Sequence, residues 1–187
     1  GATQLMWMFH GFESIGIWDA TQRESNMLDG AAHFYDVYEC ADGEYISLGS
    51  IEPQFYALLL ELAELPAEEF ANQHDQAQWS EMKEKMTAVF KAKTQAQWCD
   101  IMEGTDVCFA PVLSFVDAPN HPANRARDTY IEVDGLTQPA PAPRFSRTPG
   151  EVMHGAHGIG EDTDAVLRAM GFAEQDIAGL RESGGIG

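Results

Sequence analysis

The residue best placed for chemistry is Asp29, which stands between the apolar pair Met27-Leu28 and Gly30, just ahead of a strand-like aromatic stretch at residues 34–40. A carboxylate in such surroundings is poorly placed to be a solvated surface charge. We expect it to be desolvated and to carry a proton that it can exchange. The competing interpretation is that Asp29 caps a turn, since Asp-Gly is a common turn dipeptide. On local chemistry alone, the turn-capping interpretation is favoured.

The wider sequence changes that weighting. Residues 23–45, which contain the Asp29 motif, resemble the family III CoA-transferases and, within them, the α-methylacyl-CoA racemases. Similar segments follow in the family's order at residues 49–56, 105–113, 141–148, 160–163 and 167–172. Because several separate motifs agree over nearly the whole chain, this signal is far more specific than any one motif.

The resemblance implies an α+β fold. The chain is expected to contain the small domain of a family III CoA-transferase, together with flanking helical arms that belong to an incomplete Rossmann-like large domain. We expect residues 1–33 to form a helical arm and the active-site segment of the large domain, and residues 34–135 to form the small domain. Residues 136–187 are then a linker and C-terminal helices that return to the large domain. In this family two chains interlock as a dimer, so the expected partner is a second copy or a missing N-terminal half.

Local patterns predict the elements of this fold. An apolar helix is expected over residues 1–18, and alternation around an Ala-Asp-Gly turn predicts a hairpin of residues 34–40 and 44–50. Further helices are expected to begin at Pro53, Gln76, Thr94, Thr163 and Glu174. A short buried strand is expected at residues 107–113 and another at residues 129–133, with a loop that contains Pro119 and Pro122 between them. A proline-rich linker is expected at residues 138–148.

The implied reaction is the epimerisation of a 2-methylacyl-CoA thioester. It removes the α-proton and returns it to the other face of the carbon, with stabilisation of an enolate oxygen. The family uses a histidine and an aspartate, and the resemblance implies that Asp29 is the aspartate. The histidine lies well upstream in these proteins, so we expect this chain alone to be inactive. The family's glutamate that hydrogen-bonds this histidine corresponds to Asp117, which is interpreted equally well as an acid at a helix N-terminus.

Two other functions stay open. A true CoA-transferase of the same family would use Asp29 as a nucleophile that accepts the acyl group as a mixed anhydride. A non-enzymatic chain would be a separately encoded half that pairs with a second chain. The histidine nearest to Asp29 is His33, where the family usually has proline. We expect His33 to be a partly exposed loop side chain and not a catalytic group.

The composition limits the partners. The formal net charge is −19, with only 11 Lys and Arg residues, which argues against nucleic-acid binding and places the phosphate-binding residues for CoA elsewhere. Three cysteines without close-pair spacing argue against a disulfide framework or a metal site and fit a reducing cytoplasm. No apolar run is long enough to span a bilayer. We expect no cofactor other than CoA, which is part of the acyl-CoA substrate.

Overall fold

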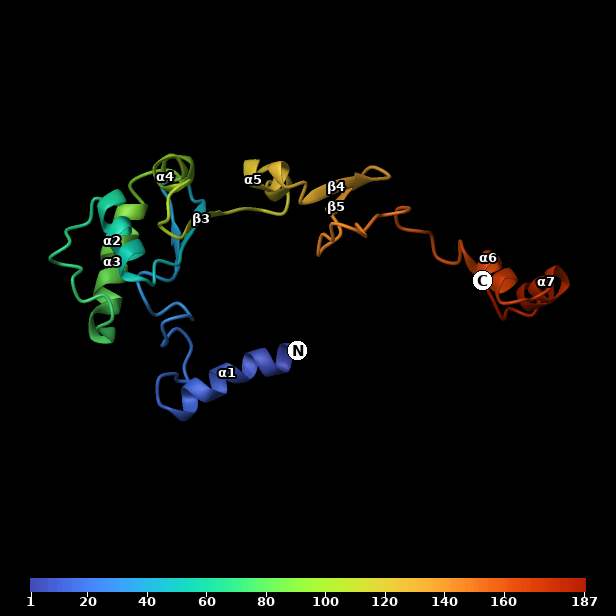
Figure 1. Cartoon of the computed structure of the whole chain (residues 1–187), viewed down its shortest axis with the longest axis horizontal. Helices are drawn as coiled ribbons and strands as arrows, with labels where there is room; N and C mark the ends of the chain where they lie inside the picture. Colours follow the sequence, from blue (N-terminus) through green and yellow to red (C-terminus); the bar gives the residue numbers. More distant parts are fainter. The chain divides into compact units, whose positions relative to one another are not determined.

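The computed structural model describes residues 1–187, which form two compact units, Gly1–Ser114 and Phe115–Gly187 (Figure 1). Both units mix helices and strands, as the predicted fold class requires. The three-part division expected from the sequence refers to a large domain of which the chain holds only a part, and it stays a prediction. None of the helices is both long enough and apolar enough to cross a membrane.

An antiparallel sheet of three strands organises the first unit. In spatial order its strands are β1 (Val37–Glu39), β2 (Tyr45–Leu48) and β3 (Phe109–Val112). The β1–β2 pair confirms the predicted hairpin. Gly43 in its turn has a φ of 84°, a left-handed conformation that glycine adopts without steric cost. β3 returns from far along the chain to pair with β2, so that Val37, Ser47 and Ala110 lie in register across the sheet.

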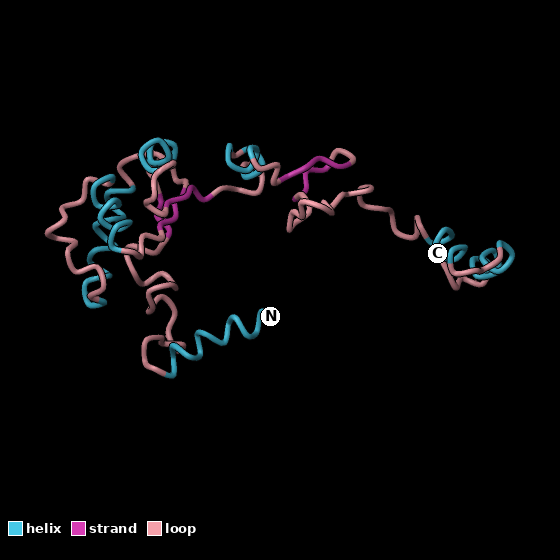
Figure 2. The backbone as a smooth tube through the Cα atoms, viewed as in Figure 1, coloured by secondary structure: helices cyan, strands magenta, loops and turns pink.

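Helices pack against this sheet (Figure 2). They are α2 (Pro53–Leu62), α3 (Trp79–Phe90), which follows the short 3-10 helix η1 (Gln76–Gln78), and α4 (Gln95–Met102). α3 lies against β1 and α4 lies against β3. α2 begins with Pro53 at a position where its missing N–H costs nothing, and Thr94 caps α4 in a reciprocal capping box with Gln97.

The core lies between the helices and one face of the sheet. Tyr38 and Ile46 point inward from neighbouring strands, whereas Val37 and Tyr45, which alternate with them, are exposed. The buried side of α3 carries Trp79, Met82, Met86 and Phe90, and α4 adds Trp98. The Met and Trp side chains on the inner sides of these two helices are therefore core residues.

Helix α1 (Ala2–Ser14) is confirmed as an apolar helix, but it has no buried residue. Leu5 is 72% exposed and Trp7 is 66% exposed, and Ile15 and Ile17 beyond the helix are exposed as well. Apolar side chains gathered on one segment in this way are typical of a surface that another part of a protein covers.

The second unit consists of short elements. They are η2 (Ala118–Asn120), α5 (Pro122–Ala126), the β4–β5 hairpin (Tyr130–Val133 and Leu136–Pro139), α6 (Thr163–Ala169) and α7 (Glu174–Glu182). The two helices nearest the C-terminus were predicted from the sequence. Gly171, which follows α6, has a φ of 93°, the left-handed conformation that is common for a glycine that ends a helix.

Three local predictions need correction. Residues 138 and 139 belong to β5 and not to a linker, because the Asp134-Gly135 turn reverses the chain directly onto β4. Residues 122–126 form the short helix α5 where only a loop was expected. β3 alternates between half-buried and exposed residues instead of being fully buried, because helices pack on only one face of its sheet.

Candidate functional site

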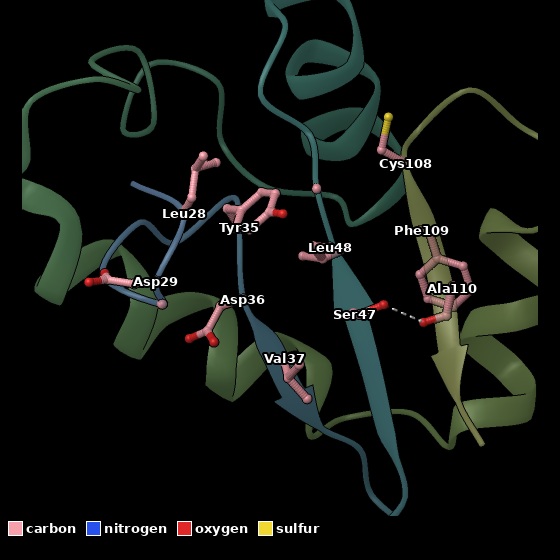
Figure 3. A pocket seen from close by; sticks show the side chains of 12 residues that line it. Leu28, Asp29, Tyr35, Asp36, Val37, Ser47, Leu48, Cys108, Phe109 and Ala110 are labelled. Atoms are coloured by element: carbon pink, nitrogen blue, oxygen red, sulfur yellow. Dashed lines mark hydrogen bonds between the residues drawn. The ribbon is translucent and has the colours of Figure 1, made fainter. Parts of the chain in front are cut away.

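The candidate site is a cleft in the first unit, with a volume of about 580 Å³, which is within the usual range for small-molecule sites. One side is formed by the segment that precedes and begins β1, and the other by β2 and β3 (Figure 3). Its lining residues are Leu28, Asp29, Gly30, Tyr35, Asp36, Val37, Ser47, Leu48, Gly49, Cys108, Phe109 and Ala110. The cleft therefore combines two carboxylates with a largely apolar wall.

Asp29 lies in the cleft lining, where the sequence placed the chemistry, and it is half-buried. Its Oδ1 accepts a hydrogen bond from the Asn26 backbone N–H at 2.7 Å, and its Oδ2 accepts one from Asn26 Nδ2, also at 2.7 Å. Asn26 is itself buried, and its Oδ1 accepts the backbone N–H of Asp19 at 2.7 Å. These bonds are those of a turn-capping carboxylate. The proton-transfer role of Asp29 stays a prediction.

Gly30 joins the Asp29 turn to the rest of the unit. Its φ of 99° is accessible to glycine and strained for other residues, and an added Cβ would lie 3.6 Å from Asp36 Oδ1. The Gly30 carbonyl accepts a hydrogen bond from Lys83 Nζ, and the same ammonium forms an ion pair with Asp36. Sequence reasoning missed Lys83, because it lies on α3, 53 residues after Gly30. Only the packing of α3 against β1 brings it to the cleft.

The expectation that His33 is a partly exposed loop side chain is wrong, because His33 is buried and only 1% exposed. Its Nε2 lies 2.7 Å from the Tyr56 hydroxyl, which donates to the Phe70 carbonyl at 3.1 Å. The hydroxyl has one proton, so His33 is assigned the tautomer that donates from Nε2. Its Nδ1 is buried without a hydrogen-bond partner. Burial lowers the pKa of His33 to about 4, with a smaller contribution from His74. Its sequence neighbours Ala32 and Phe34 are buried as well, and the imidazole packs against the rings of Tyr56 and Phe70.

The second predicted site residue, Asp117, lies in the second unit at the N-cap position of η2. Its side chain is exposed and does not cap that helix, whereas its backbone carbonyl accepts the Asn120 N–H at 2.9 Å. Glu52 occupies the N-cap position of α2, is also exposed, and makes no side-chain capping bond. Both acids thus stand at helix N-termini, which is the structural interpretation that the sequence offered for Asp117.

Cys108 marks the β3 side of the cleft. Its φ of 58° is a left-handed conformation that is uncommon for residues other than glycine, and its carbonyl accepts the Gly49 N–H at 2.9 Å. Burial, with Glu52 and Asp106 nearby, raises the pKa of the Cys108 thiol. The thiol is therefore protonated near neutral pH and is not an activated nucleophile. All three cysteines are free.

Comparison with known proteins places these features in context. Residues 3–163 match the family model described as CoA-transferase family III. The chain is 46% identical over 171 residues to the mouse protein named alpha-methylacyl-CoA racemase, covering 90% of this chain and 44% of that protein. It is 41% identical over 175 residues to the human protein of the same name, covering 88% of this chain and 44% of that protein. The chain thus spans less than half the length of these curated relatives.

Solved structures show the same fold at low sequence identity. The protein Rv3272 from Mycobacterium tuberculosis superposes with a TM-score of 0.58 at 18% identity, over 72% of this chain and 39% of that one. A CAIB/BAIF family protein from Brucella suis superposes with a TM-score of 0.57 at 17% identity, over 86% of this chain and 43% of that one. At these identities the likeness concerns the fold alone.

Proposed function

Because this chain belongs to CoA-transferase family III, we propose that it supplies part of an α-methylacyl-CoA racemase that epimerises 2-methylacyl-CoA thioesters. The observation that carries the proposal is the identity of 46% to the mouse racemase over most of the chain. The cleft supports it, since a largely apolar wall suits an acyl group and a carboxylate lies at its edge. The acyl-CoA is the substrate, and no further cofactor enters the proposal.

The proposed reaction exchanges the proton at C2 and inverts the configuration of that carbon. A base removes the proton from C2, and the electron pair of the C–H bond passes to the thioester oxygen as an enolate. An acid on the opposite face then returns a proton to C2, which restores the thioester with inverted configuration. Each well-placed acid or base contributes about 10² to 10⁴ in rate.

In this proposal Asp29 is one acid/base group, and the second comes from the part of the racemase length that this chain does not cover. To exchange a proton, Asp29 must release one of its two hydrogen bonds from Asn26. Asp117 is proposed to orient the second group through a hydrogen bond. These two assignments rest on the family resemblance, and the turn-capping interpretation of Asp29 is the alternative that the test must separate from them.

The test uses a chimera that joins the upstream half of the mouse racemase to residues 1–187. Incubated with a single epimer of 2-methylacyl-CoA in deuterated water, the chimera should incorporate deuterium at C2 and produce the other epimer. Asp29→Asn should abolish both, because an amide of nearly the same size cannot accept or return the proton. Asp100→Asn on the exposed side of α4 is the control and should be unchanged. Normal exchange in the Asp29→Asn chimera would leave Asp29 only its turn-capping role.

The family description also allows a transferase, in which Asp29 would attack the thioester. Treatment of the chimera with acyl-CoA and hydroxylamine distinguishes the two reactions. A racemase forms no acyl-enzyme and gives no adduct. A hydroxamate at Asp29, detected by mass spectrometry, would show a mixed anhydride and would replace the racemase by a CoA-transferase.

The proposed partner is a second copy of the chain in an interlocked homodimer, or the half that completes the large domain. The exposed apolar residues of α1 support this proposal, since they need a partner to cover them. The proposed location is the cytoplasm, which the three free cysteines support.

A further inference from the structure

The charge of the cleft is unbalanced when its lining is considered alone. Asp29 and Asp36 both line it, and no Lys, Arg or His is among its lining residues. An acyl-CoA carries a polyanionic nucleotide, and the proposed intermediate is an enolate. Two uncompensated carboxylates at the reacting thioester would therefore raise the energy of both the bound substrate and the intermediate.

Lys83 supplies the missing positive charge from behind the cleft wall. It lies on α3, and its ammonium contacts the Asp36 carboxylate and the Gly30 carbonyl at the same time. The side chain of Lys83 is 31% exposed and that of Asp36 is 19% exposed, so solvent screens this pair less than it screens a surface ion pair. The contact ties together three parts of the first unit: α3, the turn after Asp29 and the start of β1.

Gly30 is suited to this contact by its backbone. Its φ of 99° is a conformation that other residues adopt only with strain, while an added Cβ would lie at an ordinary contact distance of 3.6 Å from Asp36 Oδ1. If the ammonium were removed, Asp36 would lose its counter-charge and the Gly30 carbonyl would lose its hydrogen-bond donor. Asp29 precedes Gly30 in the chain, so a shift of Gly30 would also move Asp29. The wall of the cleft therefore depends on a side chain that does not line it.

We propose that Lys83 is a positioning residue of this cleft, which fixes the wall formed by Gly30 and Asp36 and offsets the charge of Asp36 that would otherwise repel the anionic acyl-CoA and its enolate. Its effect on turnover rests on the proposed function, but its effect on the geometry of the wall does not. Lys85 is the matched control, because it also lies on α3 but forms its ion pairs with Glu69 and Glu81, outside the cleft lining.

The structural arm uses isotope-labelled residues 1–187 and compares the backbone amide signals of Lys83→Met and Lys85→Met. We expect Lys83→Met to shift the signals of residues 28–36 and to leave those of α4 in place, and Lys85→Met to leave both unchanged. Lys83→Arg, which keeps the charge and a donor, should restore most of the native signals. Unshifted signals of residues 28–36 in Lys83→Met would overturn the proposal.

The kinetic arm uses the same substitutions in the chimera with the upstream half of the mouse racemase. Lys83→Met should lower kcat/KM by about tenfold to a hundredfold, the usual effect of a displaced wall. Lys83→Arg should stay near the unsubstituted protein, as should Lys85→Met. Adding Asp36→Asn to Lys83→Met removes the uncompensated carboxylate and should raise kcat/KM by at least about threefold over Lys83→Met alone. The proposal would be overturned if Asp36→Asn did not raise kcat/KM, or if Lys83→Met and Lys85→Met lowered kcat/KM equally.

The two arms keep this inference separate from the proposed function. A chimera that is inactive without any substitution would contradict the proposed function, and the amide signals would still decide whether Lys83 holds the wall. An active chimera in which Lys83→Met behaves like Lys85→Met would contradict the role of Lys83 alone.

Discussion

The imidazole Nε2 of His33 lies 2.7 Å from the Tyr56 hydroxyl, and this pair connects the cleft segment to helix α2 inside the core. The Tyr38 hydroxyl donates to the backbone carbonyl of His33 at 2.6 Å, so that the residue is held by both its side chain and its main chain. The start of the segment is held by Asn26 and Asp29, and its middle by Lys83. The cleft wall is thus a loop that His33 links to α2 and β1 and that Lys83 links to α3, whereas the bonds of Asn26 and Asp29 hold the loop to itself.

The burial of His33 predicts that stability falls in mild acid. Its pKa is about 4 in the folded chain and about 6.5 in an unfolded chain, so the unfolded chain binds more protons between these values. The contribution of His33 is complete above pH 6.5 and is lost as the pH falls toward 4. Between pH 7 and pH 5 we expect a loss of about 2 kcal/mol in the free energy of unfolding.

Urea unfolding at pH 7 and pH 5 measures this loss. A His33→Gln variant should lose less stability between the two pH values than the natural chain does, whereas His10→Gln on the exposed helix α1 should lose as much as the natural chain. An equal pH dependence in the His33→Gln variant and the natural chain would show that other groups cause the acid sensitivity.

Tyr56→Phe should destabilise the first unit by about 1 to 3 kcal/mol, because it leaves His33 Nε2 and the Phe70 carbonyl buried without their partner. Tyr45→Phe is the control. Tyr45 is 44% exposed, so its variant should stay within about 0.5 kcal/mol of the natural chain. Thermal unfolding of both variants at neutral pH tests the difference, and equal midpoints would contradict it.

Asp29→Asn should lower stability as well as act on the chemistry. The amide keeps one acceptor for the Asn26 backbone N–H, but its NH₂ group then faces Asn26 Nδ2, donor against donor. We expect a loss of about 1 to 3 kcal/mol by chemical denaturation. Asp100→Asn should change the free energy of unfolding by less than about 0.5 kcal/mol. A fully stable Asp29→Asn chain would contradict the turn-capping contacts.

The exposed residues of α1 predict self-association of the chain. At micromolar concentration, light scattering should show species larger than a monomer, and Trp7→Glu should shift them toward the monomer by placing a charge on the apolar surface. Met153→Glu, at an exposed apolar residue of the second unit, is the comparison and should have a smaller effect. A clean monomer of the natural chain would count against an interface at α1.

Residues 1–187 alone should show no racemase activity, since the chain spans 44% of the mouse relative. Incubation with one epimer of 2-methylacyl-CoA in deuterated water should give exchange at C2 no faster than buffer does. Exchange well above the buffer control would show that a complete acid/base pair lies within these residues.

Local sequence patterns were sufficient for the elements whose determinants are close in the chain. The β1–β2 hairpin follows from alternation around Asp42-Gly43, and α4 follows from its Thr94 cap, because turn and capping bonds join residues only a few positions apart. The family resemblance likewise rests on motifs that are continuous in sequence, and it reached the family that the comparisons show.

Tertiary packing decided what the sequence left open. The partners of Lys83 lie 53 residues and 47 residues away, at Gly30 and Asp36, and Tyr56 lies 23 residues from His33. No local pattern encodes such pairs, because they form only when α2 and α3 pack against the sheet. The same packing buried His33, which we expected to be partly exposed, and it left Asp29 half-exposed where its apolar neighbours suggested burial. The residues next to a side chain in the sequence indicate whether its segment favours water. Whether the side chain is buried depends on which distant element packs against it.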